Sequence, residues 1–244
     1  SFPLFMTQQV KPNIMVLIDN SGSMNFNAYG TWEGDNETVS GEPFQCGGQE
    51  IRVAQSMDDA EESASTGANS WYDNSDFDLG GFNNSGSGTI SDPYVMTGPS
   101  VVGVRFQGIV IPQGATVTNA YITFEAYADS KTAPADTEFV FRADQTDDSN
   151  WFPNSADEIQ SRPTTAASVT WKDVPAWTTG DTYDTPTLKA IVQEIVNRPG
   201  WSPGNAISFI ISGDGTRDAR PSDYGDNTHG PVLHLEFDGC KEYY

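Results

Sequence analysis

The apolar residues of this chain are mostly β-branched or aromatic, and this feature constrains the fold more than any other. Valine (16) and isoleucine (13) together outnumber leucine (6) almost five to one, and 13 Phe, 9 Tyr and 6 Trp add to them. Such residues pack well on a pleated sheet and lose side-chain freedom in a helix. The 23 Gly and 15 Pro interrupt the 244-residue chain often, which is typical of short strands joined by turns. An all-helical fold is excluded, and the sequence predicts a mostly β fold.

The chain also carries a strong negative charge. Its 12 Lys and Arg stand against 34 Asp and Glu, a formal net charge of −22. A surface this acidic repels phosphate backbones and anionic lipid headgroups, so we expect neither nucleic acid nor a membrane surface as a partner. Divalent cations are the natural counter-charge. No apolar run approaches the ~20 residues that cross a bilayer, so membrane insertion is not expected either.

Cysteine usage indicates an extracellular location. The two cysteines, Cys46 and Cys240, fit a secreted protein with one disulfide better than a zinc site, which would want four ligands. The chain opens at Ser1 without a basic and apolar leader, and we expect that a signal peptide has been removed. The predicted location is therefore the cell surface or the medium.

Four segments differ in character. Residues 1–24 hold an uninterrupted apolar run, Ile14–Ile18, which is typical of a strand buried on both faces. Residues 25–47 are rich in turn formers and are predicted to be a linker, and residues 240–244 form a tail. Residues 48–239 carry the signals of an antiparallel sandwich, with strands expected at residues 101–111, 116–128, 138–143, 168–171, 206–212 and 231–237.

One helix is predicted near residue 190. Thr185 is a good N-cap, Pro186 suits the first helical position, and apolar residues recur at helical spacing from Leu188 to Val196. Pro199 and the glycine after it end the pattern. We expect the apolar face of this helix to cap one end or edge of the sandwich.

A metal-type loop follows the first apolar run directly. In Asp19-Asn20-Ser21-Gly22-Ser23 one carboxylate and two hydroxyls could converge on a hard cation, and oxygen ligands suit Mg²⁺ or Ca²⁺. In a chain so rich in Asp and Ser this pattern also arises by chance. Its place at the end of a buried strand is what favours a metal site.

Residues 3–6 (PLFM) and 11–24 (KPNIMVLIDNSGSM) resemble the start of PilY-type adhesins, which are associated with type IV pili. In that family a von Willebrand factor A domain opens with a metal ion-dependent adhesion site, and a stretch like residues 240–244 (CKEYY) follows later. The resemblance implies an extracellular adhesion protein with pilus components as partners, and calcium or magnesium at Asp19, Ser21 and Ser23. The Thr and Asp that complete the family's site have no counterpart here, because no alternation of strands and helices follows Asn25. We therefore expect an incomplete site in a piece of a longer protein.

The segment after residue 47 is similar to secreted bacterial β-sandwich modules of the DNRLRE and disaggregatase-related type. Residues 102–106, 111–117, 170–171, 176–177, 192–206 and 231–237 carry the likeness. It implies a jelly-roll-like antiparallel sandwich with one short helix, inserted into the first loop of the A-type domain, and leaves carbohydrate binding open. Cys46 and Cys240 flank this module, so we expect a disulfide between them, with two free buried thiols as the alternative.

Acidic clusters raise the possibility of a structural calcium ion. The best placed comes at the start of the sandwich and comprises Asp58, Asp59, Glu61 and Glu62. Further groups lie at residues 144–148 and 214–226, and none has the spacing of an EF-hand. The alternative for each cluster is a solvated acidic surface.

Aromatic residues in loops suggest a second kind of site. Candidates for stacking against a sugar are Trp71, Tyr72, Trp151 and Trp201, and the alternative is packing in the core or at strand ends. The two histidines, His229 and His234, lie near no Ser or Cys nucleophile motif, and no phosphate-binding loop or zinc-protease motif occurs. Catalysis is therefore not expected, although carboxylate pairs for glycoside hydrolysis leave no sequence signature.

Three functions remain compatible with the sequence. The chain could be the front of a PilY-type adhesin. It could be a structural subunit whose strand Ile14, Met15, Val16, Leu17 and Ile18 pairs with a neighbouring copy to build a filament. It could also be a module that binds surface glycans. All three are non-enzymatic and extracellular.

Overall fold

The computed structural model describes residues 47–53, 55–67, 77–81, 99–129, 137–225 and 228–238. The chain divides into two units, Ser1–Trp32 and Glu33–Tyr244, and every described residue belongs to the second. The predicted strand Ile14–Ile18 and the boundaries drawn at residues 24 and 239 lie outside the described residues.

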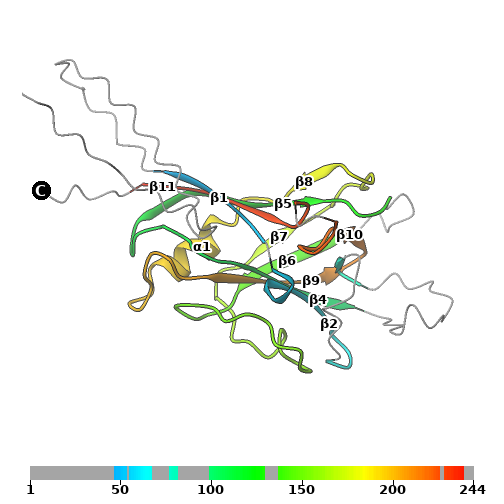
Figure 1. Ribbon diagram of the computed structural model, residues 1–244, viewed down its shortest axis with the longest axis horizontal. Helices are drawn as coiled ribbons and strands as arrows, with labels where there is room; N and C mark the ends of the chain where they lie inside the picture. The colour runs from blue at the N-terminus through cyan, green and yellow to red at the C-terminus, as the bar shows by residue number, and fades with distance from the viewer. Residues whose placement is uncertain are drawn as a thin grey trace, which may run out of the picture. The chain divides into compact units, whose positions relative to one another are not determined.

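Two antiparallel sheets dominate the fold (Figure 1). The four-stranded sheet has the order β1-β11-β5-β8: β1 (Gly48–Arg52), β11 (Val232–Asp238), β5 (Thr116–Glu125) and β8 (Thr182–Asp184). The five-stranded sheet has the order β2-β4-β9-β6-β7: β2 (Asp59–Ser63), β4 (Ser100–Phe106), β9 (Ile207–Asp214), β6 (Glu138–Ala143) and β7 (Val169–Trp171). A small pair, β3 (Phe77–Leu79) and β10 (Arg217–Ala219), lies beside them. The predicted mostly β antiparallel sandwich is confirmed.

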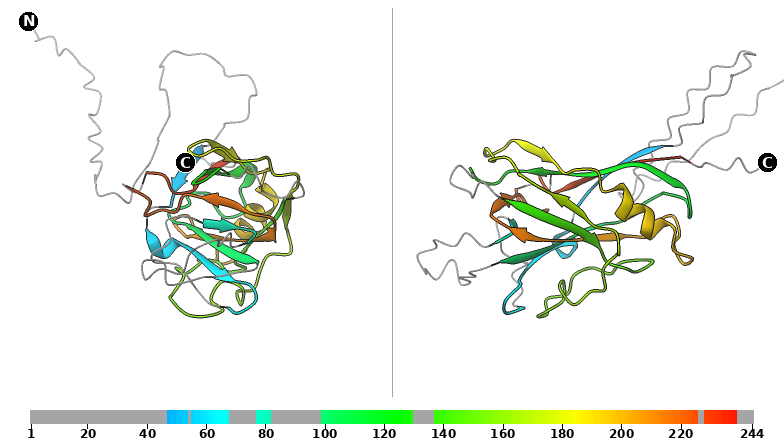
Figure 2. Two further views of the ribbon diagram at one scale, coloured as in Figure 1. Left: turned by 90° about the vertical axis from the view of Figure 1, so that its right-hand side faces the viewer. Right: turned by 180° about the vertical axis from the view of Figure 1, so that it is seen from behind.

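Consecutive strands repeatedly change sheets. The chain passes from β4 in the five-stranded sheet to β5 in the four-stranded sheet and back to β6, a pattern of connection that jelly rolls use. The two sheets lie face to face in side view (Figure 2). Strand pairing is antiparallel at every named ladder, including β11 against β5, where a bulge falls between Glu236 and Phe237.

The main core fills the space between the sheets, because alternate side chains of each strand point inward. In β5 the buried residues include Val117, Ala120, Ile122 and Phe124. On the neighbouring strands β4 and β9, the rings of Phe106 and Phe209 meet edge to face with centroids 5.9 Å apart. A second, smaller core lies against β2, β4 and β9, and consists of Ala60, Val101, Phe152, Ile159 and Ile210.

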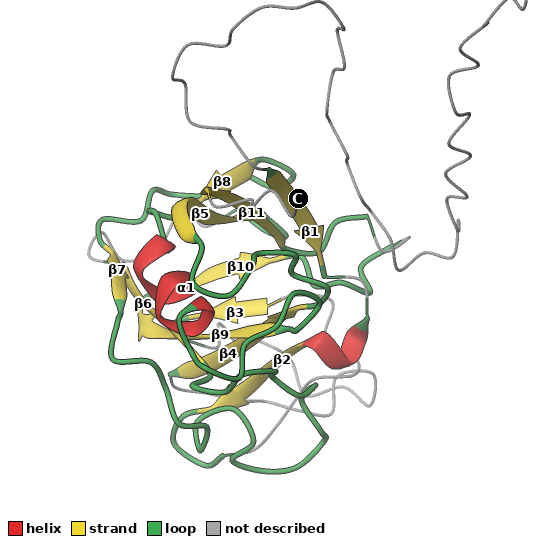
Figure 3. Cartoon of the chain, turned by 90° about the vertical axis from the view of Figure 1, so that its left-hand side faces the viewer, coloured by secondary structure: helices red, strands yellow, loops and turns green. Residues whose placement is uncertain are grey.

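The predicted helix is present but begins later than expected. In the described residues α1 (Lys189–Val196) is the one α-helix, with Leu188 as its N-cap (Figure 3). Thr185 is not the cap, because it still pairs with β5: its Oγ1 accepts the N–H of Ile122 at 3.0 Å and its own N–H donates to the Ile122 carbonyl. Helical geometry therefore starts only after the chain leaves the sheet.

As expected, α1 caps one end of the sandwich. It contacts β5 of one sheet and β6 of the other and buries Ile191, Val192, Ile195 and Val196. Gln193 fastens it to the sheet, since its Oε1 accepts the N–H of Val117 and its Nε2 donates to the carbonyl of Ala115. Two hydrogen bonds from the Gln193 side chain thus satisfy backbone groups at the start of β5 that have no strand partner on that side among the described residues.

Two predicted elements differ from the structure in length. The strand expected at residues 101–111 ends at Phe106, and the one at 116–128 ends at Glu125. The acidic segment after residue 58 was not expected to be a strand at all, yet it forms β2, in which all five residues are buried. The main core covers one face of the sheet beside β2, and the smaller core covers the other.

Candidate functional site

A cleft lies where the long connection from β6 to β7 folds back on itself. Its volume is about 390 Å³, at the lower end of the range for small-ligand sites. Every lining side chain except one proline is polar: Asp144, Gln145, Thr146, Asp148, Asn150, Glu158, Arg162 and Pro163. The sequence placed Asp144 and Asp148 in an acidic cluster but offered no sign that Arg162 lies beside them.

The start of this connection is anchored to the sheet. Asp144 directly follows β6, forms an isolated bridge with Thr164, and donates its N–H to the carbonyl of Ser208 at 2.9 Å. Its Oδ2 accepts the hydroxyl proton of Ser149 at 2.7 Å, and the hydroxyls of Ser149 and Ser208 lie 2.7 Å apart. Asp144 and Ser149 are both buried, so this small network holds the floor of the cleft in one arrangement.

Arg162 clamps the two sides of the cleft together. Its Nη1 donates to Asp144 Oδ2 at 3.2 Å, to Ser149 Oγ at 3.1 Å and to the Asn150 carbonyl at 2.9 Å. Its Nη2 donates to the Trp151 carbonyl and to Glu158 Oε1, both at 2.9 Å, and its Nε donates to the Glu158 carbonyl. A guanidinium has five N–H groups, and these contacts occupy all three nitrogens.

Arg162 holds the backbone of Trp151, but the aromatic side chain of Trp151 is exposed. With 44% of its surface accessible, it is the exposed large hydrophobic residue among the described residues. The next residue, Phe152, is fully buried, and the guanidinium of Arg162 lies 4.3 Å above its ring. The backbone of Trp151 is thus fixed on one side by Arg162 and on the other by a buried neighbour. Tryptophan is one of the residues enriched among those that contribute most to binding.

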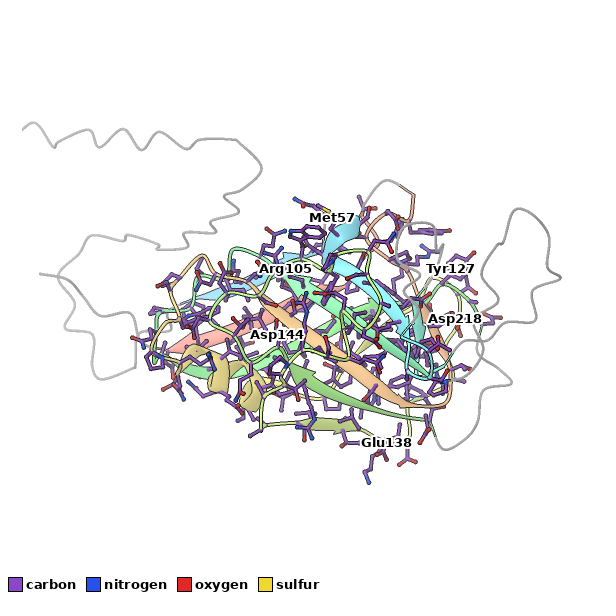
Figure 4. All side chains as sticks on the ribbon, turned by 90° about the horizontal axis from the view of Figure 1, so that it is seen from below. Met57, Arg105, Tyr127, Glu138, Asp144 and Asp218 are labelled. Atoms are coloured by element: carbon purple, nitrogen blue, oxygen red, sulfur yellow. The ribbon has the colours of Figure 1, made fainter. Side chains whose placement is uncertain are left out.

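A second arginine, Arg105 on β4, also holds the loop of residues 149–151. Arg105 on β4 donates from Nε to the Ser149 carbonyl at 2.6 Å and from Nη1 to Asp58 Oδ1 at 2.6 Å. Gln107 donates to the other oxygen of Asp58. Figure 4 labels Arg105 and Asp144, with Tyr127 and Asp218 marking the far end of the molecule. Asp58, a predicted calcium ligand, therefore serves to orient Arg105.

The other predicted calcium ligands are also buried, each with a separate partner. Asp59 Oδ2 accepts the N–H of Ser222 at 2.6 Å, Glu61 Oε2 that of Asp78 at 2.9 Å, and Glu62 Oε2 that of Ile159 at 2.7 Å. The alternative of a solvated acidic surface is wrong for this cluster, because all four residues are at most 3% exposed. Their carboxylates do not converge. Over the described ranges no group of three or more His, Cys, Asp or Glu side chains could hold a metal ion.

Burial changes the acidity of this strand. Desolvation raises the pKa of Asp59 from its ordinary value of 3.8 to about 8, against the opposing hydrogen bonds from Ser222. Desolvation likewise raises the pKa of Glu62, against hydrogen bonds from Ile159 and Gln160. These shifts arise from the buried position of β2.

The predicted glycan contacts separate into exposed and buried residues. Trp151 is exposed and directly follows Asn150, which lines the cleft. Trp201 is only 2% exposed, and its indole N–H donates to the carbonyl of Ile111 at 2.9 Å. The sugar role predicted for Trp201 is therefore wrong, because the ring packs in the core. Trp71 and Tyr72 lie outside the described residues.

The remaining predicted sites also lie outside the described residues. They are the metal-type loop with Asp19, Ser21 and Ser23, the strand Ile14–Ile18, and the cysteines Cys46 and Cys240. What the structure does show is where the flanking strands meet: Gly48 of β1 lies opposite Glu236 of β11, and the Gly47 carbonyl accepts the N–H of Phe237 at 3.3 Å.

A second polar cluster, which the sequence did not indicate, lies where β5 ends. Glu125 pairs with Arg220 and with His229, whose Nδ1 lies 2.7 Å from Glu125 Oε2. The guanidinium of Arg220 lies 4.5 Å above the ring of Tyr224, which meets Tyr127 edge to face. The contacts of this cluster hold the loop before β11 against the sheet.

No protein-family model and no curated protein matches the chain. Among the described residues, no helix is both long enough and apolar enough to cross a membrane. Function is therefore inferred from the cleft and its side chains.

Proposed function

We propose that this chain is a non-enzymatic, extracellular surface or adhesion protein whose β-sandwich binds glycans at the cleft described above. The observation that carries the proposal is Trp151, an exposed indole on a clamped loop beside a polar cleft. Sugars present apolar C–H faces and polar hydroxyls together. An aromatic ring next to fixed acceptors complements both.

The rigidity of the loop supports a binding role. Arg162 and Arg105 hold the carbonyls of residues 149–151, so a ligand would not have to order this segment when it binds. Binding costs less free energy when the site is already in its bound conformation. Binding residues are disproportionately found on loops that a rigid scaffold holds in place.

The contacts of the carboxylates favour binding over hydrolysis. A glycosidase needs an acid and a base or nucleophile that can exchange protons with the substrate. In this cleft both Asp144 and Glu158 accept hydrogen bonds from the same guanidinium. Arg162 thus engages an oxygen of each of these carboxylates within the protein, where a hydrolase would direct them toward its substrate.

The setting of the module comes from the sequence. Residues 3–24 resemble the opening of PilY-type adhesins, and the sandwich resembles secreted accessory modules. We infer an extracellular location, pilus components or surface glycans as partners, and calcium or magnesium as ions that the Asp19, Ser21 and Ser23 loop would take if a longer chain completes the site. The alternative, a filament built by pairing of Ile14–Ile18 with another copy, depends on residues outside the described part.

The test is a glycan array with the full chain, followed by calorimetry on the best ligand. Trp151→Ala should weaken binding by about tenfold, equivalent to ~1.4 kcal/mol, because a stacked aromatic contact is lost. Trp151→Phe should retain part of the affinity, since an aromatic face remains. Both variants should keep the wild-type unfolding midpoint, because the indole is exposed. The proposal is abandoned if no glycan binds, if Trp151→Ala binds as well as the wild type, or if new reducing ends appear.

A further inference from the structure

The charge of the cleft limits which glycans it can accept. Three carboxylates line it, those of Asp144, Asp148 and Glu158, against the single guanidinium of Arg162, which leaves a formal charge of −2. Nearby on the loop, Asp147 is paired with Arg198 at 2.6 Å, so this pair adds no net charge to the cleft. The whole chain carries −22, so its long-range field has the same sign as the cleft.

Arg162 cannot act as an anion receptor. Its Nε, Nη1 and Nη2 atoms all donate to acceptors of the protein, and its side chain is only 9% exposed. A ligand carboxylate or sulfate would have to displace one of these bonds and would also face three carboxylates. Uronic acids and sulfated sugars are therefore disfavoured by both hydrogen bonding and charge.

Asp148 is the carboxylate best placed to meet a ligand. It is exposed, unlike Asp144, and its Oδ1 accepts the N–H of Ala206 at 2.8 Å, which fixes the side chain at the edge of the cleft. The same turn is held by Asn205, whose side chain donates to the Asp147 carbonyl at 3.0 Å. A carboxylate has about four lone-pair positions, so Asp148 retains acceptor capacity for an incoming donor.

We propose that the cleft selects glycans carrying free, protonated amines, that is, oligomers of amino sugars, over neutral and acidic glycans. This inference rests on the glycan-binding function proposed above and names its ligand class. The ammonium group of an amino sugar supplies the positive charge and the N–H donors that the carboxylates of Asp148 and Glu158 accept, while a ring face stacks on Trp151. A neutral sugar offers the stacking alone.

Four oligomers of equal length and the same linkage test this selection: glucosamine, glucose, N-acetylglucosamine and a uronic acid. Binding to the full chain is measured by calorimetry in mildly acidic buffer, at low and at high salt. We expect glucosamine to bind about three- to tenfold more tightly than glucose at low salt, the size of one or two exposed ion pairs. Added salt should reduce this preference, because it screens exposed charges. The uronic acid oligomer should bind least.

Two variants separate local charge from the charge of the whole chain. Asp148→Asn keeps an oxygen for the Ala206 N–H and should lower the ratio of glucosamine to glucose affinity toward one. Glu138→Gln makes the same change of charge at the opposite end of β6 from Asp144 and should leave that ratio unaltered (Figure 4). A steric preference against the acetyl group would be insensitive to salt and would not appear against glucose.

The outcomes distinguish the two proposals. Binding of all four oligomers with similar affinity, or a preference that Asp148→Asn does not alter, overturns the selection of amino sugars and leaves glycan binding intact. Binding of none of these oligomers and of no other glycan overturns the proposed function together with this inference. A salt-sensitive preference for glucosamine that Asp148→Asn reduces and Glu138→Gln does not supports both.

Discussion

Tyr121 and His234 lie directly opposite each other on β5 and β11, with their rings stacked at a centroid distance of 4.5 Å and an angle of 8° between planes. A chain of side-chain hydrogen bonds through this imidazole also links all four strands of the sheet. Its Nδ1 lies 3.1 Å from Glu50 on β1, and its Nε2 lies 3.0 Å from the hydroxyl of Thr123 on β5. That hydroxyl donates to Asp184 on β8 at 2.6 Å. A hydroxyl has one proton, so in this arrangement Nε2–H of His234 donates to Thr123.

A double-mutant cycle should detect this bridge. Thr123→Val keeps a β-branched residue and removes the link between His234 and Asp184, so we expect a loss of ~0.5–1.5 kcal/mol in the free energy of unfolding. The loss should shrink when His234→Ala is already present, since the two side chains are coupled. Urea unfolding measures all four proteins, with Thr118→Val on the same strand as the control. Additive effects would show that the bridge contributes nothing.

Asp59 makes stability depend on pH in a defined direction. Burial raises its pKa in the folded chain to about 8, against an ordinary value of 3.8. Between pH 3.8 and about 8 the unfolded chain releases the Asp59 proton and the folded chain keeps it. The contribution of Asp59 to the free energy of unfolding therefore falls by about 1.4 kcal/mol per pH unit as the pH rises. The contribution is fully present below pH ~4 and is lost above the folded-state pKa.

Asp59→Asn should remove this slope. The amide oxygen can still accept the Ser222 N–H, and no proton is exchanged on unfolding. In urea unfolding from about pH 4 upward, the free energy of unfolding of Asp59→Asn should rise relative to that of the wild type as the pH rises. Above the folded-state pKa of Asp59 the difference between the two proteins should stay constant. Parallel curves for the two proteins would mean that Asp59 is ionised in the folded chain.

Much of the sandwich was predictable because its strands alternate buried and exposed residues. Residues 138–143 form a strand with the bounds expected from sequence, and β5 and β11 differ from expectation only at their ends. Strand β2 was missed for a physical reason. Its carboxylates accept hydrogen bonds from the backbone N–H groups of Ser222, Asp78 and Ile159, which lie far away in the sequence, so no local pattern shows that an acidic segment can be buried.

The sequence singled out Trp151 and the acidic group at residues 144–148, but not the cleft. Sequence composition places several aromatics in loops but cannot tell which ring the fold covers, and Trp201 is buried because α1 and the segment after it close over the core. The cleft itself depends on Arg162, whose partners converge only when residues 144–151 fold back on residues 158–162. Such convergence is a property of tertiary structure and has no spacing signature.

Arg162 should be difficult to replace even by another cation. Arg162→Lys retains the charge but loses the planar fork that reaches the Asn150 and Trp151 carbonyls. We expect a loss of roughly 3 kcal/mol in the free energy of unfolding, as for breaking a largely buried ion pair, together with weaker glycan binding. Thermal unfolding and calorimetry report the two effects. A stable variant with wild-type affinity would contradict the clamp.

The disulfide predicted between Cys46 and Cys240 lies outside the described residues and stays a prediction. Gly48 lies opposite Glu236, and Cys46 and Cys240 come two residues before β1 and two residues after β11. We expect peptide mapping without reduction to recover Cys46 joined to Cys240. The bridge would close a loop of 194 residues (240 − 46), for which chain entropy gives at most about 5 kcal/mol. Recovery of both thiols alkylated without prior reduction would exclude the bridge.

Gly103 on β4 provides the space that the Trp151 loop needs. A Cβ added there would lie 2.5 Å from Cζ and 2.7 Å from Cε1 of Phe152, well inside van der Waals contact. Gly103→Ala should therefore displace Phe152, lower the free energy of unfolding by ~1–3 kcal/mol and weaken glycan binding, because Trp151 precedes the displaced ring. Gly48→Ala is the matched control, since its Cβ would meet the Leu235 carbonyl at an ordinary 3.5 Å. Phe152→Leu, which shortens the side chain, should partly rescue Gly103→Ala, and the absence of rescue would show that the ring is not what excludes a side chain at position 103.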